Sequence, residues 1–351
     1  MIRVDDDTRA HIDAAISSSL ARLAARTQTR GESAQALVAA IERAAAGGKR
    51  LRPALVVMSF DALGGDRAAV PALWQVAAAF ELLHTAFVVH DDVIDRDTAR
   101  RGVPNVGGEF RTRAERSGAD RASSAIVGDA AAILAGDLLL HEVSRLIATA
   151  DLGTRERATV LDILDEAVLV SAVGELADVE NAAGSDVPDE TILLGAAHDK
   201  TAVYSFRAPL QAGAALAGAS AADQAALAAA SAQLGLAFQL VDDLIGTFGT
   251  RAQAGRSPGA DLREGKRTPL IAFARATQAW PEVSSALAVA HTGPIAVRRA
   301  QRELTASGAR TRMVDLITDT LDEAHHQAAA LPPGARELLD TIAVAIRKRI
   351  P

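Results

Sequence analysis

The stretch WQVAAAFELLHTAFVVH, from Trp74 to His90, is apolar around most of the helix that its alanine and leucine content predicts. A second stretch, AALAAASAQLGLAFQLVDDLI from Ala225 to Ile245, has the same character. A helix that is hydrophobic on more than one face is usually a buried central helix of a large bundle. The two stretches therefore predict an all-α protein organised around central helices.

The rest of the chain also has a helical pattern. Residues that favour helices make up much of the sequence, and alternating segments typical of strands are nearly absent. Most prolines stand where a helix should begin or end, whereas Pro209 and Pro269 fall inside helical runs and predict a kink or a break. Two stretches rich in arginine and glycine, 105–123 and 249–266, are expected to be exposed excursions. We expect a single domain over residues 1–351. Apolar helical patterns recur at about 54–63, 71–95, 124–149, 157–182, 190–217, 222–248, 267–278, 313–330 and 334–349.

Charge and composition exclude several classes of protein. The 351 residues carry 37 Lys+Arg and 44 Asp+Glu, so the net charge is 37 − 44 = −7, which argues against a general nucleic-acid binder. Cysteine is absent, which excludes disulfides, thiolate metal sites and a cysteine nucleophile. Residues 1–7, MIRVDDD, lack the apolar stretch of a signal peptide, and polar or charged residues interrupt each candidate run of 18 apolar residues. We therefore expect a soluble, cytoplasmic protein without a membrane span.

An acidic cluster follows the first apolar helix, in ELLHTAFVVHDDVIDRDTARRG from Glu81 to Gly102. Asp91 and Asp95 are four residues apart, which places both carboxylates on one face of a helix, about 6 Å from each other. Asp92 and Asp97 complete a group of four carboxylates whose mutual repulsion needs compensation. A Mg²⁺ ion would provide it, because Mg²⁺ is bound by one or two carboxylates together with phosphates. The alternative is an acidic helix end that faces solvent.

A second acidic pair ends the other apolar helix, in FQLVDDLIGTFG from Phe238 to Gly249. Gln239 lies one turn before Asp242 and Asp243. Gly246 stands four residues after Asp242, so this helix face has no third carboxylate. One acidic cluster alone would be a weak signal, but two of them on two buried helices indicate a substrate that is bound through several metal ions.

Basic residues accompany both acidic clusters. Arginine binds phosphate through two parallel hydrogen bonds, and lysine acts as a point charge. Each basic pair alone is more often part of a solvated helix face. Together with two acidic clusters in a net-acidic protein, however, they predict a diphosphate site that can hold two phosphorylated groups. The candidates are Lys49, Arg50 and Arg52 in GGKRLRP, Arg100 and Arg101, Lys200 beside Thr201, and Lys266 and Arg267 before Thr268.

These motifs, in this order, resemble those of the head-to-tail trans-prenyltransferases, the isoprenyl diphosphate synthases. The resemblance runs from GGKRLRP at 47–53 to GKRTPLI at 265–271. Between them it includes the segment 81–102, AAILAGDLLL at 131–140, the Lys200–Thr201 pair, FQLVDDLIG and DLREGKRT. The resemblance implies an all-α bundle with a central cavity, at whose mouth the two acidic motifs face each other. It also implies condensation of isopentenyl diphosphate with an allylic diphosphate, supported by up to three Mg²⁺ ions.

The resemblance also assigns roles to individual residues. Asp91 and Asp95 would bind the Mg²⁺ ions that bridge the allylic diphosphate. Asp242 would bind a further ion, supported by Asp243 and Gln239. The other assigned positions bind the diphosphates: Arg100, Lys200 and Lys266 the allylic one, and Lys49, Arg52, His84 and Arg101 the isopentenyl one, with Thr201 and Arg256 as further substrate-binding candidates.

Three positions depart from the family pattern. Gly246 replaces a third aspartate of the second motif, Arg256 replaces a lysine, and Glu175 in GELAD replaces a glutamine, while Asp178 of the same stretch remains. Asp92 is expected to support the metal ligands rather than to bind metal. Because no central role is lost, we expect an active subunit.

Product length in the family that this chain resembles is set by side chains beneath the first acidic motif. Phe87 lies four residues before Asp91, and Leu83 lies four before Phe87, so both are predicted to point along the cavity wall. Ala86 is a small neighbour that leaves room. This combination predicts a short product, with geranylgeranyl diphosphate as first choice and farnesyl diphosphate as the alternative. Packing between helices is the other role open to Phe87.

Two further functions share part of the pattern. A terpene cyclase has a similar fold and a DDxxD motif but lacks a second diphosphate site, whereas this chain has both GGKRLRP and the Arg100–Arg101 pair. A non-catalytic subunit of a heteromeric synthase would be expected to lose its acidic motifs. We therefore predict an enzyme that elongates prenyl chains. The apolar face at 71–89 is compatible with a homodimer, which the family also favours.

Overall fold

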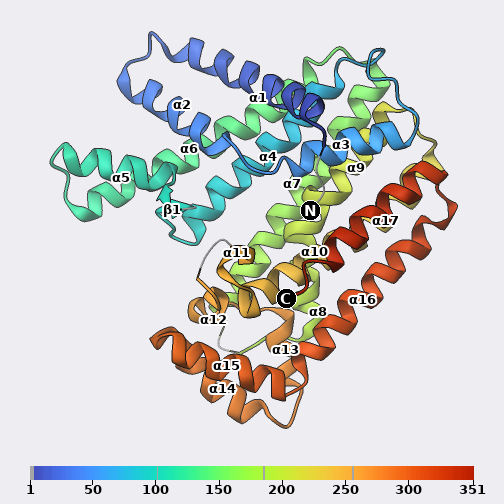
Figure 1. The fold of residues 1–351 in the computed structure, drawn as a ribbon. Coiled ribbons are helices and arrows are strands. Elements are labelled where there is room, and N and C mark those ends of the chain that lie inside the picture. Colours follow the sequence, from blue (N-terminus) through green and yellow to red (C-terminus); the bar gives the residue numbers. More distant parts are fainter. Residues whose placement is uncertain (1–3, 101, 185, 255–256) are drawn as a thin grey trace. The chain divides into compact units, whose positions relative to one another are not determined.

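The computed structural model of the protein describes residues 4–100, 102–184, 186–254 and 257–351. Nearly every element in this part of the chain is a helix, and the two strands form one short hairpin (Figure 1). The predicted all-α class is therefore confirmed. The chain divides into two compact units. We call residues 4–162 with 212–218 the N-terminal unit, and residues 163–211 with 219–351 the C-terminal unit. The single domain with a central cavity stays a prediction, since each unit is described by itself.

The N-terminal unit is built around α4. Its elements are α1 (Asp6–Thr27), α2 (Glu32–Ala45), α3 (Leu51–Ala62), α4 (Leu73–Ile94), β1 (Ala99–Arg100), β2 (Val103–Pro104), α5 (Val106–Arg116), α6 (Arg121–Ala148) and the start of α7 (Thr154–Ala183). Helices α1, α3 and α6 pack against α4. Every apolar side chain from Val76 to Leu83 is at most 1% exposed. Burial of each large one stabilises the fold by about 1.5–3 kcal/mol. The segment Trp74–His90 is thus the central helix of this unit, as predicted.

The C-terminal unit is built around α10 (Ala221–Phe248). Its other elements are the end of α7, α8 (Glu190–Ala197), η1 (His198–Arg207), the start of α9 (Ala208–Leu216), α11 (Arg251–Ala254), α12 (Ala260–Glu264), α13 (Pro269–Arg275), α14 (Trp280–Ala288), η2 (Ala290–Thr292), α15 (Pro294–Ala306), α16 (Ala309–Gln327), η3 (Ala328–Ala330) and α17 (Pro333–Arg347). Element η1 and helices α16 and α17 pack against α10. Figure 1 shows α16 and α17, in red, running antiparallel to each other. The second apolar stretch is therefore also a central helix.

A ten-residue π-helix, η1, interrupts the helical run at 190–217. Such wide turns are rare and are often found at functional sites. Two glycines make room for η1. A Cβ atom on Gly174 of α7 would lie 2.3 Å from the backbone nitrogen of Lys200, and one on Gly235 of α10 would lie 2.6 Å from Cα of Ala202. Because any side chain at either glycine would collide with the backbone of η1, these two positions allow the π-helix to pack closely against both helices.

Several local expectations are refined or corrected. Pro209 is the second residue of α9, which begins where η1 ends, so the interruption predicted there is the change from π- to α-helix. Pro269 is the first residue of α13 and does not break it. The excursion expected at 105–123 is partly confirmed: the stretch contains α5, whose first turn is buried, whereas most residues from 113 to 123 are exposed. The excursion at 249–266 likewise contains α11 and α12, and its residues 260–262 are buried. Arginine and glycine suggested loops there, whereas tertiary contacts stabilise short helices.

Within the described part of the chain, three helices are long and apolar enough to cross a membrane by length and composition alone. They are α4, α6 and α10, and the share of each apolar window that is buried inside the structure is 67%, 39% and 44%. For α4 and α10, packing at the centre of a unit accounts for the apolar composition, because both helices carry the buried residues of that unit's core.

A buried carboxylate joins α1 to α6. Glu142 is 1% exposed, and it accepts hydrogen bonds from Ser19 Oγ at 2.6 Å and from Arg145 Nε at 2.9 Å. Arg22 of α1 forms an ion pair with the same carboxylate. Burial alone would raise the pKa of Glu142, but the hydrogen bonds from Arg145, Ser19 and Arg22 outweigh it and hold the pKa below its ordinary value.

We predict that Glu142→Ala lowers the free energy of unfolding of the protein by about 3 kcal/mol at neutral pH, because two arginines lose their buried counter-ion. A lowered pKa stabilises the fold above the unfolded-state pKa, and this contribution is lost as the pH falls through the folded-state pKa. The variant should therefore lose less stability than the wild type between about pH 5 and pH 3. Urea denaturation across this pH range tests both points. Glu109→Ala, which breaks the more exposed pair with Arg43, should cost no more than about 1 kcal/mol; an equal loss in the two variants would contradict the prediction.

Candidate active site

The first acidic cluster lies at the C-terminal end of α4. The backbone N–H of Asp95 donates to the carbonyl of Asp91 at 2.8 Å, so the two carboxylates are one helical turn apart, as the spacing predicted. Asp91 is half-buried and Asp95 is exposed. Asp92 is 4% exposed and accepts hydrogen bonds from Arg100 Nε at 2.9 Å and Nη2 at 2.6 Å. Arg100 also lies 3.5 Å from the carboxylate of Asp91. Asp92 is thus turned toward Arg100, which agrees with a supporting role.

Burial raises the pKa of Asp92, and the hydrogen bonds from Arg100 only partly offset this effect. The short hairpin holds Arg100 beside this group, since Arg100 of β1 pairs with Val103 of β2. Asn105, which follows the hairpin, donates to the carbonyl of Asp97 at 2.8 Å and accepts from the N–H of Gly108 at 2.8 Å as the N-cap of α5. Asn105 therefore ties the end of the acidic cluster to α5. An asparagine just before a helix is a cap signal that the sequence reasoning did not use.

The basic loop before α3 separates its three cations. Lys49 is exposed and Arg52 is half-buried, but Arg50 is 6% exposed. Arg50 Nε donates to Asp13 Oδ1 at 2.8 Å, and its Nη1 donates to Glu81 Oε1 of α4 at 3.0 Å. Arg50 is therefore committed to holding the loop on α1 and α4, and Lys49 and Arg52 stay the predicted diphosphate contacts of this loop. His84, three residues after Glu81 on α4, is half-buried.

The second acidic cluster lies near the end of α10. Asp242 is half-buried, whereas Asp243 is buried and accepts a hydrogen bond from Gln239 Nε2 at 2.8 Å. Gln239 thus contacts Asp243. Burial raises the pKa of Asp243 well above its ordinary value, and the charges of Asp261, Asp242 and Asp178 act in the same direction. The two aspartates of this pair are consequently in different environments, as are Asp91 and Asp92 in the N-terminal unit.

The carboxylate of Asp261 occupies the space above Gly246. A Cβ atom on Gly246 would lie 1.7 Å from Asp261 Oδ2. Asp261 is 5% exposed and belongs to the short helix α12, which packs against α10. The carboxylate that seemed to be missing after Asp242 is therefore supplied from a different helix. Sequence reasoning missed Asp261 as a site residue, although DLREGKRT was part of the motif, because the spacing rule applies only within one helix.

The remaining basic candidates differ in their partners. Lys200 Nζ lies 3.0 Å from Glu175 Oε1 and 2.9 Å from Asp178 Oδ2, so Glu175 forms an ion pair with this lysine. Thr201 follows Lys200 in η1. Lys266 lies 3.9 Å from Glu264. Arg101 and Arg256 lie outside the described residues.

Arg267 is a structural residue. Its guanidinium donates to the backbone carbonyls of Asn181, Gly184 and Asp186, and thereby holds the segment between α7 and α8. Of the two neighbouring cations at 266–267, the arginine is thus engaged with backbone, and Lys266 is the candidate for a substrate contact.

The three residues proposed to limit product length lie on α4. Leu83 and Ala86 are fully buried, whereas Phe87 is half-buried. Phe87 stands one turn before Asp91, as the spacing requires. Its role as the floor of a cavity stays a prediction.

Mg²⁺ fits the residues that the sequence nominated. The described residues contain no group of three or more histidine, aspartate or glutamate side chains that could hold a metal ion by themselves. Mg²⁺ usually keeps several waters and is bound by one or two carboxylates plus substrate phosphates. The pair Asp91 and Asp95 in the N-terminal unit is therefore chemically suited to an ion that arrives with a diphosphate, and so, taken by itself, is the half-buried Asp242 of the C-terminal unit.

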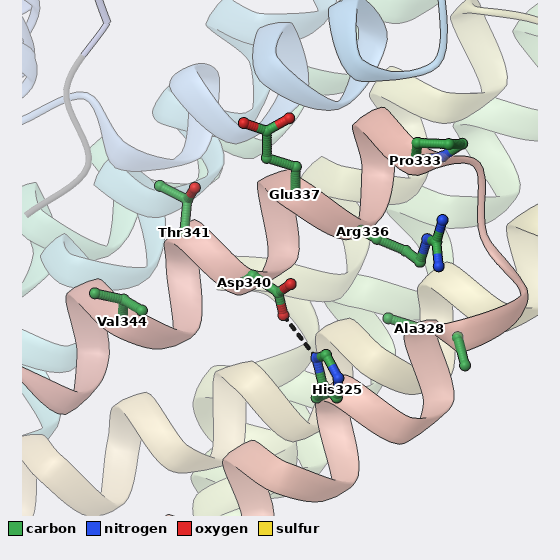
Figure 2. A pocket seen from close by; sticks show the side chains of 9 residues that line it. His325, Ala328, Pro333, Arg336, Glu337, Asp340, Thr341 and Val344 are labelled. Carbon is green, nitrogen blue, oxygen red and sulfur yellow. Dashed lines mark hydrogen bonds and ion pairs between the residues drawn. The ribbon is translucent and has the colours of Figure 1, made fainter.

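A pocket elsewhere in the C-terminal unit contains none of these residues. It has a volume of about 560 Å³ and lies between the end of α16, η3 and α17 (Figure 2). Figure 2 shows His325 and Asp340 pointing toward each other across it, with Nδ1 and Oδ1 2.8 Å apart. Both side chains are at least half exposed, so the pair is a surface contact.

Known proteins match this chain over most of its length. The family model described as polyprenyl synthetase matches residues 34–303. Geranylgeranyl diphosphate synthase of Sulfolobus acidocaldarius is 31% identical over 64% of this chain and 62% of its own length. Octaprenyl diphosphate synthase of Escherichia coli is 33% identical over 64% and 62%, respectively. The matched part thus spans about three-fifths of these curated relatives.

A solved structure resembles nearly the whole chain. It is geranylgeranyl pyrophosphate synthase from Corynebacterium glutamicum, complexed with isoprenyl diphosphate and magnesium. Its TM-score is 0.90 at 26% identity, and the similarity covers 99% of this chain and 100% of that one.

We predict that Gly246→Asp, which would restore a third aspartate on α10, disrupts the site. The new side chain would meet Asp261 in a buried, negatively charged space, so the free energy of unfolding should fall by about 3 kcal/mol or more. Gly246→Ala should also be destabilising. Gly195→Ala is the matched control, because Gly195 is an exposed helical glycine with open space around its Cβ position; it should stabilise the protein by about 0.5–1 kcal/mol. Thermal and urea denaturation provide the measurement, and a Gly246→Asp protein as stable as the wild type would contradict the assignment of this space to Asp261.

Proposed function

Because this chain belongs to the polyprenyl synthetase family, we propose that it is an enzyme that condenses isopentenyl diphosphate with an allylic diphosphate. The family match over residues 34–303 carries this proposal, since that range contains both acidic clusters and every basic candidate. Curated relatives that are named as diphosphate synthases support an enzyme that transfers prenyl groups.

We propose that the enzyme depends on Mg²⁺, with Asp91 and Asp95 as ligands in the N-terminal unit and Asp242 as a ligand in the C-terminal unit. The magnesium and isoprenyl diphosphate in the Corynebacterium structure support this assignment. When bound, the ions neutralise the negative charge that develops on the diphosphate leaving group. We propose up to three Mg²⁺ ions, the number that the family resemblance of the sequence implies.

The protein's own cations act on the same charge. Lys200 lies between two carboxylates and Arg100 lies on Asp92, so each is held at a fixed position by acidic neighbours. Cations fixed in advance stabilise developing charge without reorganising during the reaction. Lys49, Arg52 and His84 would hold the isopentenyl diphosphate. With both substrates bound, the condensation becomes effectively unimolecular, because the reacting carbons are already held near each other.

The proposed reaction needs no side-chain nucleophile. The allylic C–O bond breaks, and its electron pair leaves with the diphosphate. The double bond of isopentenyl diphosphate then supplies the electrons for the new C–C bond. The released diphosphate accepts the proton that is lost as the double bond re-forms. Apolar walls exclude water, which would otherwise capture the allylic cation.

A geranylgeranyl product is our first choice. Relatives of similar identity are named for farnesyl, geranylgeranyl, geranylfarnesyl, octaprenyl and nonaprenyl diphosphate, so the choice among products rests on this chain's own residues. Phe87, one turn before Asp91, supports a short product, and the small Ala86 supports geranylgeranyl over farnesyl diphosphate, which is the alternative.

A terpene cyclase and a non-catalytic subunit fit less well. The exposed Lys49 and the half-buried Arg52 and His84 provide a second group of cationic and polar side chains, which a cyclase with a single diphosphate substrate does not require. Asp91, Asp95 and Asp242 are all present, which disfavours a subunit without catalytic function.

We also propose a cytoplasmic homodimer. Helix α6 carries a row of exposed apolar side chains, among them Ile126, Ile133 and Leu134, and α7 carries Leu169, Val173 and Leu176. Spacings of three, four, seven and eight residues place each set on one helix face. Exposed apolar rows of this kind suit contact with a second copy. The face at 71–89 that the sequence suggested does not, because most of its residues are buried within the N-terminal unit. Sedimentation velocity at micromolar concentration would show the mass of a monomer if this proposal is wrong.

We predict that Asp91→Ala reduces turnover of an allylic diphosphate by at least about a hundredfold, because it removes charge that acts in the transition state. The purified protein is incubated with isopentenyl diphosphate, Mg²⁺ and dimethylallyl, geranyl or farnesyl diphosphate in turn. Circular dichroism verifies that the variant is folded. Asp315→Ala, at an exposed position of α16, is the control and should keep full activity. Full activity of the Asp91 variant would refute the metal role.

We predict that Phe87→Ala shifts the products toward longer chains, because it removes the largest side chain one turn below Asp91. Chromatographic sizing of the products from radiolabelled isopentenyl diphosphate measures the distribution. Val88→Ala is the matched control, since adjacent helical residues point about 100° apart, and it should leave the distribution unchanged. If the two variants give the same products as the wild type, Phe87 packs between helices and does not limit length.

A further inference from the structure

Arg349 lies against the acidic end of α10, within the C-terminal unit. It follows α17, which ends at Arg347. Its guanidinium forms an ion pair with Oδ1 of Asp242 and stands 4.3 Å above the ring of Phe238. Phe238 and Asp242 are four residues apart on α10, so they lie on one face of the helix. The ring of Phe238 stacks on the guanidinium plane of Arg349, and the carboxylate of Asp242 pairs with its charge.

One donor of Arg349 has no hydrogen-bond partner. The Nη1 atom is buried and unpaired within the described residues, although the side chain as a whole is 20% exposed. A buried N–H group without an acceptor costs about 1–3 kcal/mol, and more when the group is charged. An unpaired donor beside the nominated metal ligand indicates that an acceptor belongs there.

The surroundings contain more negative charge than Arg349 alone can neutralise. Asp243 is buried next to Asp242, and Asp261 and Asp178 are close enough to act on the charge of Asp243, although Asp178 is also paired with Lys200. In a metal-free protein, a guanidinium on Asp242 reduces this repulsion. A metal ion that binds Oδ1 of Asp242 must displace the guanidinium of Arg349, because the two cations would occupy the same position beside this oxygen.

We propose that Arg349 is a positioning and substrate-binding residue that serves Asp242 and the diphosphate in turn. In the metal-free enzyme it is the counter-ion of Asp242. When Mg²⁺ occupies this carboxylate, Arg349 keeps its place on Phe238 and donates to the diphosphate oxygens that arrive with the ion. The proposal rests on the proposed metal role of Asp242 and adds a cation that the sequence motifs do not contain.

This exchange has a signature that a purely structural arginine would not produce. Removal of Arg349 eliminates a competitor for Asp242, so affinity for a metal ion alone should rise. The same change eliminates a donor to the diphosphate, so affinity for inorganic diphosphate at saturating Mg²⁺ should fall. The two affinities are thus expected to move in opposite directions.

The test uses Arg349→Met in the full chain, because methionine retains much of the apolar contact with Phe238 without the charge. Mn²⁺, which takes the same hard oxygen ligands, is titrated alone, and the free ion is followed by electron paramagnetic resonance. Inorganic diphosphate is titrated calorimetrically at fixed excess Mg²⁺. We expect Mn²⁺ affinity to rise about three- to tenfold and diphosphate affinity to fall about tenfold, as for loss of one charge-assisted hydrogen bond.

Arg310→Met is the matched control. Arg310 stacks 4.8 Å from the ring of Phe248, which is on α10 like Phe238, and donates to an oxygen of Pro351 at 2.6 Å. It therefore anchors the segment that follows α17, whereas the ion pair with Asp242 is made by Arg349. This variant should leave both affinities unchanged. Equal Mn²⁺ binding by the wild type and Arg349→Met, including no binding by either, would overturn the proposal. Affinities that fall together, or an unchanged diphosphate affinity, would overturn it as well.

Asp242→Asn separates this proposal from the proposed function. If Asp242 is a metal ligand, this variant binds Mn²⁺ more weakly, and adding Arg349→Met to it produces no further rise. If Asp242→Asn binds Mn²⁺ as the wild type does, the metal role of Asp242 is wrong, whatever the single Arg349 variant shows.

Discussion

Repulsion among the carboxylates at the ends of α4 and α10 is the constraint on which the rest of the structure depends. Each helix is apolar enough to occupy the centre of its unit, and each ends in adjacent aspartates. In both pairs one aspartate is turned inward and hydrogen-bonded, Asp92 to Arg100 and Asp243 to Gln239. The other, Asp91 or Asp242, remains half-buried. In both units one aspartate of the pair is thus committed to an inward hydrogen bond, and the other is the one that we propose as a metal ligand.

Carboxylates near the two clusters also fix the positions of cations. Arg100 is held by Asp92, and Lys200 is held by Glu175 and Asp178. These pairs keep positive charges beside the acidic clusters before any substrate arrives. Two other basic residues of the same motifs stabilise the fold instead. Arg50 donates to the buried carboxylate of Glu81, and Arg267 donates to backbone carbonyls. A basic residue in a motif therefore acquires its role from the direction that the backbone gives to its side chain.

Much of the fold and part of the site could be predicted from the sequence. Apolar periodicity identified α4 and α10, and the four-residue spacing placed Asp91 and Asp95 one helical turn apart, because these rules act within a single helix. The motif order led to the family that the comparisons show. The same local rules missed Asp261 and Arg349, which reach α10 from other helices. They also missed the π-helix, which depends on the absence of side chains at Gly174 and Gly235.

The sequence by itself determined the helical class, the family and the positions of the two acidic clusters, because each of these depends on residue patterns within short stretches of the chain. Only the tertiary structure decided that Arg50 is buried while Lys49 is exposed, that Asp261 fills the space above Gly246, and that Arg349 neutralises Asp242. The physical reason is that burial, charge pairing and steric exclusion act between residues far apart in the chain. No spacing rule within one helix can specify which distant side chain will occupy a given space.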